Sequence, residues 1–359
     1  MSKTHILHVQ NVNHALEHGL TFLRYHGLRE DSRNGPVLVA PGPVITETVH
    51  PEQRVLFSPL RDANPFFHLT EALWMLAGRN EIDDLTPLVK TFGQFSDDGK
   101  TMPAAYGHRW RKHFGHDQLW EIVEELRTDP KSRRCVLAMW DPGYKTEDEW
   151  PGGGEGYAPG HIQSGGDLTK ETKDKPCNTH VYFRIESGKL DMTVLCRSND
   201  AVWGAHGANA VHFSVLQEWL AASIGVQLGT MYQVSNNYHI YAERDDVKRL
   251  VDGSGVHYVP HNLYNHVRAV PLVQAFETTE DFQLDCEALF DKGFISDFTT
   301  LFFRDVYMPM MQAWWSYRDG WDDACRAQVA QLNGSVDWHV DASRWLSKRL
   351  KARNTELPA

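Results

Sequence analysis

The sequence predicts a globular protein that combines α-helices with β-strands, and three observations support this. Hydrophobic residues make up 42% of the 359 positions, which is enough for a large core and far above the share in a disordered chain. Apolar residues recur at helical spacing in some segments and form short strand-like runs in others. No internal repeat divides the chain, whose length suits one large domain or two ordinary ones.

Four segments are predicted to form largely buried helices. Gly78 and Gly225 follow two of them directly and are natural helix C-caps. These helices are expected at residues 12–30, 66–77, 117–127 and 209–224. From about residue 296 to 353 the pattern is again mostly helical, with Pro309 expected to kink or break it.

The strands are predicted between these helices. Short apolar pieces up to about residue 57 indicate the first ones, and residues 186–188 are expected to close a hairpin. The later strands are expected at 135–140, 180–185, 189–195 and 230–241. Residues 141–174 are rich in glycine and charge, which is typical of a long insertion or flexible flap.

The charge and cysteine content exclude several functions. A net charge of −11 argues against a general nucleic-acid binder, so an anionic ligand would have to meet a local arginine cluster. The five widely spaced cysteines include no CxxC pair, so we expect neither a metal site nor a disulfide framework. With no signal peptide and no membrane-length apolar run, the sequence predicts a cytoplasmic protein that does not contact membranes.

Cys177 has the setting of a nucleophile. It follows a flexible segment and begins a strand, and Arg197 ends the strand that is predicted to pair with it. A reactive cysteine needs exposure and a nearby cation to stabilise its thiolate. The alternative for these residues alone is an inert cysteine beside a surface arginine.

Further motifs surround this pair in the sequence. They are Glu71-Ala72-Leu73-Trp74-Met75-Leu76, Tyr106-Gly107, Trp110-Arg111, Ser132-Arg133-Arg134, Pro176-Cys177, Gly188-Lys189-Leu190, Arg197-Ser198, Asp200, Asn209 and His239-Ile240-Tyr241. In order and nearly in spacing they resemble the thymidylate synthase family, over roughly residues 12–290. The resemblance implies an α+β fold with a large mixed β-sheet, flanking helices and a homodimer formed through the sheet face. It assigns 1–295 to a catalytic domain with 141–174 as an inserted loop, and 296–359 to a helical C-terminal extension.

The resemblance also implies a mechanism. Cys177 is expected to attack carbon 6 of a pyrimidine deoxynucleotide, so that carbon 5 accepts a carbon from 5,10-methylenetetrahydrofolate. Glu71 resembles the general acid/base that works through water, and a carboxylate on this apolar helix requires partners. Tyr106 resembles the tyrosine that assists removal of the carbon 5 proton. Arg197 is expected both to stabilise the thiolate and to bind phosphate.

Further binding roles follow from the same resemblance. The substrate phosphate is expected to meet arginines and one serine, with the last two arginines reaching across a dimer interface. These residues are Arg197, Ser198, Arg33, Arg133 and Arg134. His239 and Tyr241 resemble the pair that binds the sugar 3′-hydroxyl, and Asp200 the residue that contacts the folate pterin.

Asn209 is expected to read the base. A neutral amide accepts from N3–H of uracil and donates to O4, so Asn209 favours dUMP over dCMP. Counted from Arg197, it lies one residue beyond the family spacing. A one-residue insertion is therefore expected within 203–208.

The chain departs from the family around the folate. Phe92 and Phe95 stand where tryptophans are usual, Asn178 follows the nucleophile in place of histidine, and the short closing tail is not recognisable. A smaller ring at Phe92 leaves room for a water that could capture the methylene intermediate. Together with the enlarged loop and extension, this resembles the nucleotide hydroxymethylases of phages and favours 5-hydroxymethyl-dUMP as product. The alternatives are a thymidylate synthase, a dCMP or CMP hydroxymethylase, and an inactive family fold that serves as a binding scaffold.

Overall fold

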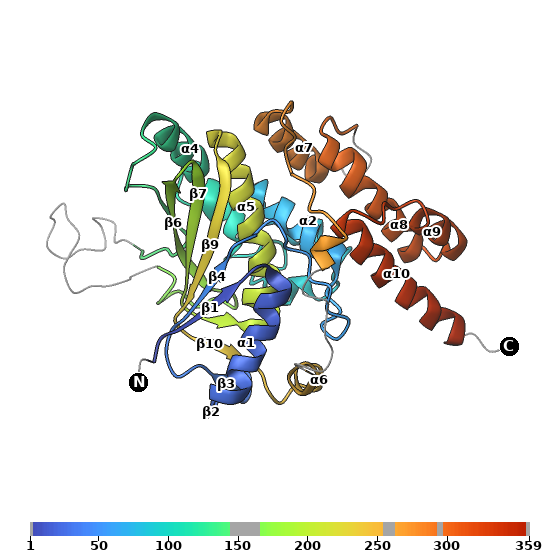
Figure 1. Ribbon diagram of the computed structural model, residues 1–359, viewed down its shortest axis with the longest axis horizontal. Coiled ribbons are helices and arrows are strands. Elements are labelled where there is room, and N and C mark those ends of the chain that lie inside the picture. The colour runs from blue at the N-terminus through green and yellow to red at the C-terminus, as the bar shows by residue number, and fades with distance from the viewer. Residues whose placement is uncertain (1–2, 144–165, 254–262, 293–296, 357–359) are drawn as a thin grey trace, which may run out of the picture.

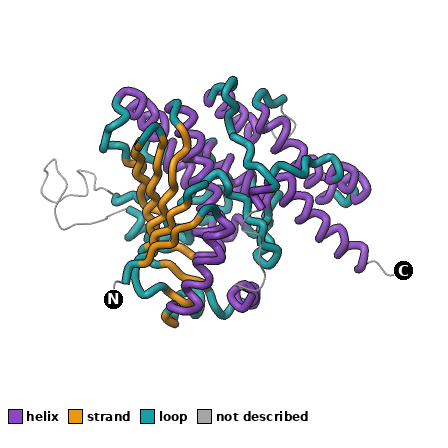
Figure 2. Tube along the Cα trace, viewed as in Figure 1, coloured by secondary structure: helices purple, strands orange, loops and turns teal. Residues whose placement is uncertain are grey.

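The computed structural model describes residues 3–143, 166–253, 263–292 and 297–356. Figure 1 shows a β-sheet on one side of the molecule, a layer of helices packed on it, and the C-terminal helices beyond that layer. Figure 2 shows the same separation of strands from helices. This mixed, segregated arrangement agrees with the α+β class expected from the sequence.

The main sheet has six strands in the order β1-β4-β9-β7-β6-β5. Their bounds are β1 His5–Val9, β4 Val44–Thr48, β9 Gln227–Ser235, β7 Lys189–Cys196, β6 Asn178–Glu186 and β5 Val136–Ala138. The β1–β4 and β7–β9 pairs are parallel and the other three pairs are antiparallel, so the sheet is mixed.

A second, four-stranded sheet lies at the end of the first and has the order β2-β3-β10-β8. Its strands are β2 Leu28–Glu30, β3 Val37–Val39, β10 Tyr238–Ile240 and β8 Asn199–Asp200. β8 follows β7 after two residues, and β10 follows β9 after two. The two sheets therefore meet where β7 and β9 end, close to the residues expected to bind substrate.

One face of the main sheet is covered by helices. The bounds are α1 Val12–His26, α2 Pro65–Leu76, α3 Tyr106–Arg111, α4 Gln118–Thr128, α5 Asn209–Ile224, α6 Asp245–Gly253 and α7 Thr279–Asp291. α5 packs on β7 and β9, and α2 packs on α5. α5 is buried on almost every side, which explains its apolar sequence.

The C-terminal segment joins the same core. It consists of a π-helical stretch, Phe302–Tyr307, followed by α8 Met308–Arg318, α9 Asp322–Val329 and α10 Asp337–Glu356. Phe302, Phe303 and Trp314 belong to the cluster of buried residues that also contains Phe66 of α2. Pro309 lies in the first turn of α8, just where the hydrogen-bond pattern changes from π to α.

The sequence predictions of individual elements were mostly confirmed, with two errors. The hairpin of β6 and β7 turns through Ser187 and Gly188, both at positive φ. The helix predicted at 12–30 ends at His26, because the chain there enters β2. The strand predicted at 230–241 is two strands in different sheets, β9 and β10.

Most of the predicted insertion at 141–174 lies outside the described residues, since only 141–143 and 166–174 are placed. In the described part, Asp167 forms a buried ion pair with Arg109 at 2.6 Å. This pair ties the segment that leads to Cys177 onto α3.

Candidate active site

Cys177 lies beside Arg197 where β6 begins and β7 ends. The two residues are held together by a backbone hydrogen bond, with Arg197 N–H donating to the Cys177 carbonyl over 2.9 Å. The Arg197 Nη2 atom is 3.9 Å from the Cys177 sulfur. The guanidinium is oriented by the carbonyls of Lys175 and Pro176, to which it donates over 3.1 and 2.9 Å. The pairing predicted from the hairpin is therefore present in the structure.

Burial and charge act in opposite directions on this thiol. Burial raises the pKa of Cys177 above its ordinary value, Arg197 lowers it, and Asp174 raises it again. The effect of burial is the larger one, so the pKa of the Cys177 thiol is raised, and Arg197 only reduces that rise. Cys177 is nevertheless partly exposed, whereas the other four cysteines are buried.

Tyr106 lies next to the nucleophile at the first residue of α3. Burial is the main cause that raises its pKa well above the ordinary value, and Cys177 adds to the rise while a hydrogen bond with the Asn178 side chain opposes it. Tyr106 therefore stays a phenol that can donate a hydrogen bond. Gly107 allows α3 this position, because a Cβ there would lie 1.8 Å from the Met75 carbonyl of α2.

Glu71 has a partner that sequence reasoning missed. Its carboxylate lies 2.9 Å from Nε2 of His212, and both side chains are buried between α2 and α5. His212 is one turn after Asn209 on α5, so this helix presents both groups to the same region. That i, i+3 spacing was the available signal, since it places a histidine on the face already predicted to bind the base.

Asn209 lies in a buried set of amides. Its Oδ1 accepts from Asn178 Nδ2 over 3.2 Å, and its Nδ2 donates to Asn199 Oδ1 over 3.1 Å. Asn178, noted in the sequence only as a departure from the family, is fully buried. The stretch before Asn209, Ala201–Ala208, is π-helical with a non-helical Gly207. A π-helical turn is how an extra residue is accommodated in a helix, in agreement with the expected one-residue insertion.

The residues expected to bind phosphate are divided between two places. Ser198 is adjacent to Arg197 and half-buried, while Arg33 is exposed in the turn between β2 and β3. Arg133 and Arg134 are exposed before β5, where Arg134 pairs with Glu125 at 2.6 Å. No contact between either of these two and Arg197 is present among the described residues, so an action across an interface stays a prediction.

The remaining predicted residues meet in the small sheet. His239 of β10 is in register with Asp200 of β8, and its ring packs edge-on against Tyr241 with centroids 5.3 Å apart. Asn34, next to Arg33, donates to the Tyr241 hydroxyl over 3.5 Å. This places the β2–β3 turn beside the expected sugar site.

Asp200 uses its two carboxylate oxygens differently. Oδ1 accepts from the backbone N–H groups of Val202 and Trp203, whereas Oδ2 is buried without a hydrogen-bond partner in the described part of the chain. Burial raises the pKa of this carboxyl above its ordinary value. A buried acceptor without a partner is suited to a ligand N–H group.

Phe92 is partly buried and packs against the edge of the hydrophobic core. Its ring contacts Phe67 and Trp74 of α2, with centroids 5.8 Å apart in each case. Phe95, the second substituted aromatic, is 50% exposed. Phe92 therefore helps to position α2, and contact with folate stays a prediction.

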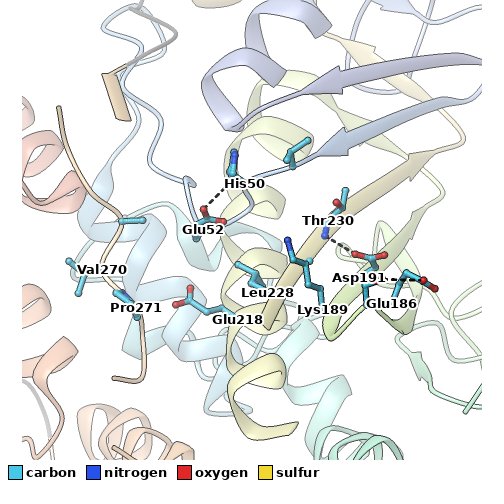
Figure 3. Close-up of a pocket in the computed structure, with 14 residues that line it drawn as sticks. His50, Glu52, Glu186, Lys189, Asp191, Glu218, Leu228, Thr230, Val270 and Pro271 are labelled. Atoms are coloured by element: carbon cyan, nitrogen blue, oxygen red, sulfur yellow. Dashed lines mark hydrogen bonds and ion pairs between the residues drawn. The ribbon is translucent and has the colours of Figure 1, made fainter. Parts of the chain in front are cut away.

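A cavity of about 610 Å³ lies at the opposite end of the strands from Cys177. Figure 3 shows Lys189, Asp191, Leu228 and Glu218 around it. Lys189 begins β7 whereas Cys196 ends it, a separation of roughly 23 Å at about 3.3 Å per residue. Carboxylates outnumber cations in its lining, so this cavity does not suit a phosphate ligand.

The described residues contain no cluster of three or more histidine, cysteine or acidic side chains arranged to hold a metal ion. None of the helices in the described ranges is long and apolar enough to cross a membrane.

Comparison with known proteins identifies the class. The family description "Thymidylate synthase" matches residues 61–285, and the chain belongs to this family. A structure of thymidylate synthase from T4 phage aligns with a TM-score of 0.50 at 18% identity, covering 68% of this chain and 80% of that one. At this identity the structural match supports the fold alone.

The similar sequences point to one branch of the family. A deoxyuridylate hydroxymethyltransferase of Pseudomonas phage M6 is 38% identical over 97% of this chain and 95% of its own length. A protein of the same name from Bacillus phage SP01 is 34% identical over 67% of this chain and 58% of its own length. The first similarity covers nearly the whole chain and so extends beyond the family match, which ends at residue 285.

Proposed function

We propose that this enzyme converts dUMP to 5-hydroxymethyl-dUMP with 5,10-methylenetetrahydrofolate as the source of the carbon. The observation that carries the proposal is the position of Cys177, partly exposed beside Arg197, together with a neutral amide at Asn209. The relative that matches nearly the whole chain bears the name of this activity.

The nucleophilic step uses Cys177 and Arg197. The thiolate adds to carbon 6 of the pyrimidine, and the electron pair of the 5,6 double bond makes carbon 5 a nucleophile. The Arg197 guanidinium stabilises the thiolate and, with Ser198 and Arg33, holds the phosphate dianion. His239 and Tyr241 bind the sugar hydroxyl from β10 and the residue just after it.

Carbon 5 then bonds to the one-carbon unit, which is still joined to a nitrogen of the folate. Loss of the carbon 5 proton expels tetrahydrofolate with the electron pair of that carbon–nitrogen bond and leaves an exocyclic methylene group on carbon 5. The folate supplies the one-carbon unit at the oxidation level of formaldehyde. Asp200 Oδ2 is suited to receive a pterin N–H group because it is buried without a partner in the described structure. Tyr106 lies close enough to Cys177 to guide the departing proton through its neutral hydroxyl.

Water completes the reaction. It adds to the methylene group on carbon 5 while the Cys177–carbon 6 bond breaks, giving the hydroxymethyl product with no net oxidation or reduction. The Glu71–His212 pair is the proton acceptor for this water, since its buried carboxylate is oriented toward α5. Thymidylate synthase activity would require hydride transfer in place of this step.

The homodimer is proposed on the face of the main sheet that no helix of the described ranges covers. One row across four strands is apolar there, and it consists of Ile6, Ile45, Val234 and Leu195. Ile6 is 46% exposed and Tyr182, in the adjacent row, 41%. Such a row is suited to a second copy of the chain, which would bring Arg133 and Arg134 to the partner's phosphate site. Sedimentation of the purified protein as a monomer at micromolar concentration would contradict this.

The direct test is mass spectrometry of the products formed from dUMP and methylenetetrahydrofolate. The proposal requires hydroxymethyl-dUMP and tetrahydrofolate in equal amounts. A methyl product with dihydrofolate would show a thymidylate synthase, and turnover of dCMP in place of dUMP would show that Asn209 was misread. If no nucleotide product forms and Cys177 is unreactive, the result would favour the alternative of an inactive family fold that serves as a binding scaffold.

A further inference from the structure

A continuous chain of buried polar side chains passes through Asn209. It consists, in order, of Cys196, Asn178, Asn209, Asn199 and Gln233, and we call it the amide relay. The Cys196 thiol donates to Asn178 over 2.6 Å, and Asn199 donates to Gln233 over 3.3 Å. Every member is 5% exposed or less. Burying amides destabilises the fold unless each donor in the series faces an acceptor.

One end of the amide relay has a fixed polarity. Gln233 Nε2 donates to the backbone carbonyl of Ala205 over 3.0 Å. A carbonyl can only accept, so the Gln233 amide cannot be turned around without placing two oxygens together. Its Oε1 must therefore face Asn199, whose Nδ2 also donates to the Ser235 hydroxyl over 2.9 Å.

This polarity passes along the amide relay. Because Asn199 presents its nitrogen to Gln233, it presents its oxygen to Asn209. The Asn209 nitrogen must then face Asn199, and its oxygen faces the nitrogen of Asn178. Each amide orientation follows from its neighbour, and the series starts from the Ala205 carbonyl, which can only accept.

The other end is closed by a thiol. Asn178 Oδ1 receives the S–H of Cys196, and burial raises the pKa of this thiol far above its ordinary value. Cys196 therefore remains a donor at neutral pH. Its role differs from that of Cys177, although the two lie at neighbouring ends of paired strands.

The orientation of Asn209 matters for the base. The amide relay uses one acceptor site and one donor of this amide, which leaves one of each for a ligand. With N3 of the base toward the Asn209 oxygen and carbon 4 toward its nitrogen, the placement that the proposed function requires, they match the N3–H donor and O4 acceptor of uracil. Cytosine presents an acceptor at N3 and a donor at N4, and would need the same amide turned by 180°.

We propose that the amide relay locks the Asn209 side chain in the orientation that accepts uracil, and that Asn178 and Asn199 are thereby positioning residues for discrimination against dCMP. The inference rests on the proposed reading of the base by Asn209. The inference adds that the selectivity for dUMP over dCMP depends partly on Asn178 and Asn199, which do not contact the base themselves.

The test measures equilibrium binding of dUMP and of dCMP by calorimetry, without folate, for the purified enzyme and four variants. Asn178→Asp keeps the acceptor for Cys196 but removes the donor to Asn209. Asn199→Ala removes the acceptor on the other side and serves as an independent variant. Cys196→Ser keeps a hydroxyl donor and is the matched control.

We expect Asn178→Asp and Asn199→Ala to lower the preference for dUMP over dCMP at least about tenfold, which a general loss of stability would not do. Cys196→Ser should keep the parent preference. Folding of each variant is checked by circular dichroism and thermal melting. An unchanged preference in folded Asn178→Asp and Asn199→Ala would overturn the inference.

The fourth variant, Asn209→Asp, separates this inference from the proposed function. One outcome is that Asn209→Asp changes the preference for dUMP over dCMP while Asn178→Asp and Asn199→Ala do not. In that case the inference that the amide relay orients Asn209 is wrong, but Asn209 still recognises the base. If Asn209→Asp also leaves the preference unchanged, the proposed reading of the base is itself wrong.

Discussion

Helix α2 contacts different parts of the molecule on its two sides, and the consecutive residues Thr70 and Glu71 face opposite sides. Glu71 faces α5, where it meets His212 in a polar, buried site. Thr70 faces the C-terminal helices and shares a 3.0 Å hydrogen bond with Tyr307. One turn earlier Phe66 stacks on Trp314 and meets Trp345 edge-on, with centroids 5.2 and 5.6 Å apart.

The side of α2 that faces α5 contributes to catalysis, and the side that faces the C-terminal helices contributes to stability. On the α5 side, groups that are costly to bury are retained because each has a specific partner, and this pattern is typical of an active site. On the C-terminal side, aromatic rings exclude water and make no contact with the nucleophile. Substitutions on the first side should therefore change rates, and those on the second should change the free energy of unfolding.

The largest expected effect is at the nucleophile. Cys177→Ala should lower kcat by at least about a thousandfold, because no covalent adduct with carbon 6 can form. The melting temperature should change little, since Cys177 is partly exposed. Single-turnover assays with dUMP measure the rate. Residual activity within tenfold of the parent would contradict the assignment of Cys177.

The next test compares the two sides of α2 directly. Glu71→Gln should lower kcat by about 10²–10⁴ because the proton acceptor is lost while the shape is kept. Its matched control is Thr70→Val, which removes the hydrogen bond to Tyr307 and should cost about 1 kcal/mol of stability with kcat unchanged. A large loss of kcat in Thr70→Val would show that the two sides are not independent.

The third test removes a ring from the C-terminal side. Trp314→Ala should lower the free energy of unfolding by about 3–5 kcal/mol, because Trp314 is buried against Phe66 and Trp345. Urea unfolding measures this change, and kcat per folded molecule should stay near the parent value. If the variant unfolds in two separate transitions, the C-terminal helices form a unit of their own.

The sequence predictions were more specific for the active-site side than for the C-terminal side. Cys177, Arg197 and Asn209 were identified by motifs, and the hairpin of β6 and β7 explained how the first two meet. Asn199 and Gln233 were missed because their roles arise from contacts between distant elements, which periodicity within one segment does not show. His212 was missed although its helical spacing from Asn209 was an available signal.

The errors in the fold have similar causes. The prediction at 230–241 ran through Asn236 and Asn237 as one strand, yet the chain leaves one sheet and enters another at these two polar residues. The predicted helix end at residue 30 failed because pairing of β2 with β3 overrides local propensity. For the C-terminal segment, helices were predicted correctly, but their docking on α2 depends on tertiary packing alone.

The last prediction concerns the pH dependence of stability on the C-terminal side. Asp337 begins α10 and accepts hydrogen bonds from Trp338 N–H over 2.8 Å and from the Tyr264 hydroxyl over 3.2 Å. Burial nevertheless raises its pKa to about 7, so the folded protein favours the protonated form. A carboxyl whose pKa is raised by folding contributes stability below its unfolded pKa, and that contribution is lost as the pH rises through the folded value.

Stability should therefore fall between about pH 4 and pH 7, and Asp337→Asn should flatten this decline because the amide stays neutral at every pH. Melting temperatures across this range measure the slope. Asp341, whose pKa is raised to about 6, leaves a smaller slope in the variant. Thr70→Val is the control, because it changes the same side of α2 without removing a group that titrates in this range, and it should keep the parent slope. An identical slope in Asp337→Asn would mean that Asp337 is ionised in the folded protein, held by Arg54 against the cost of burial.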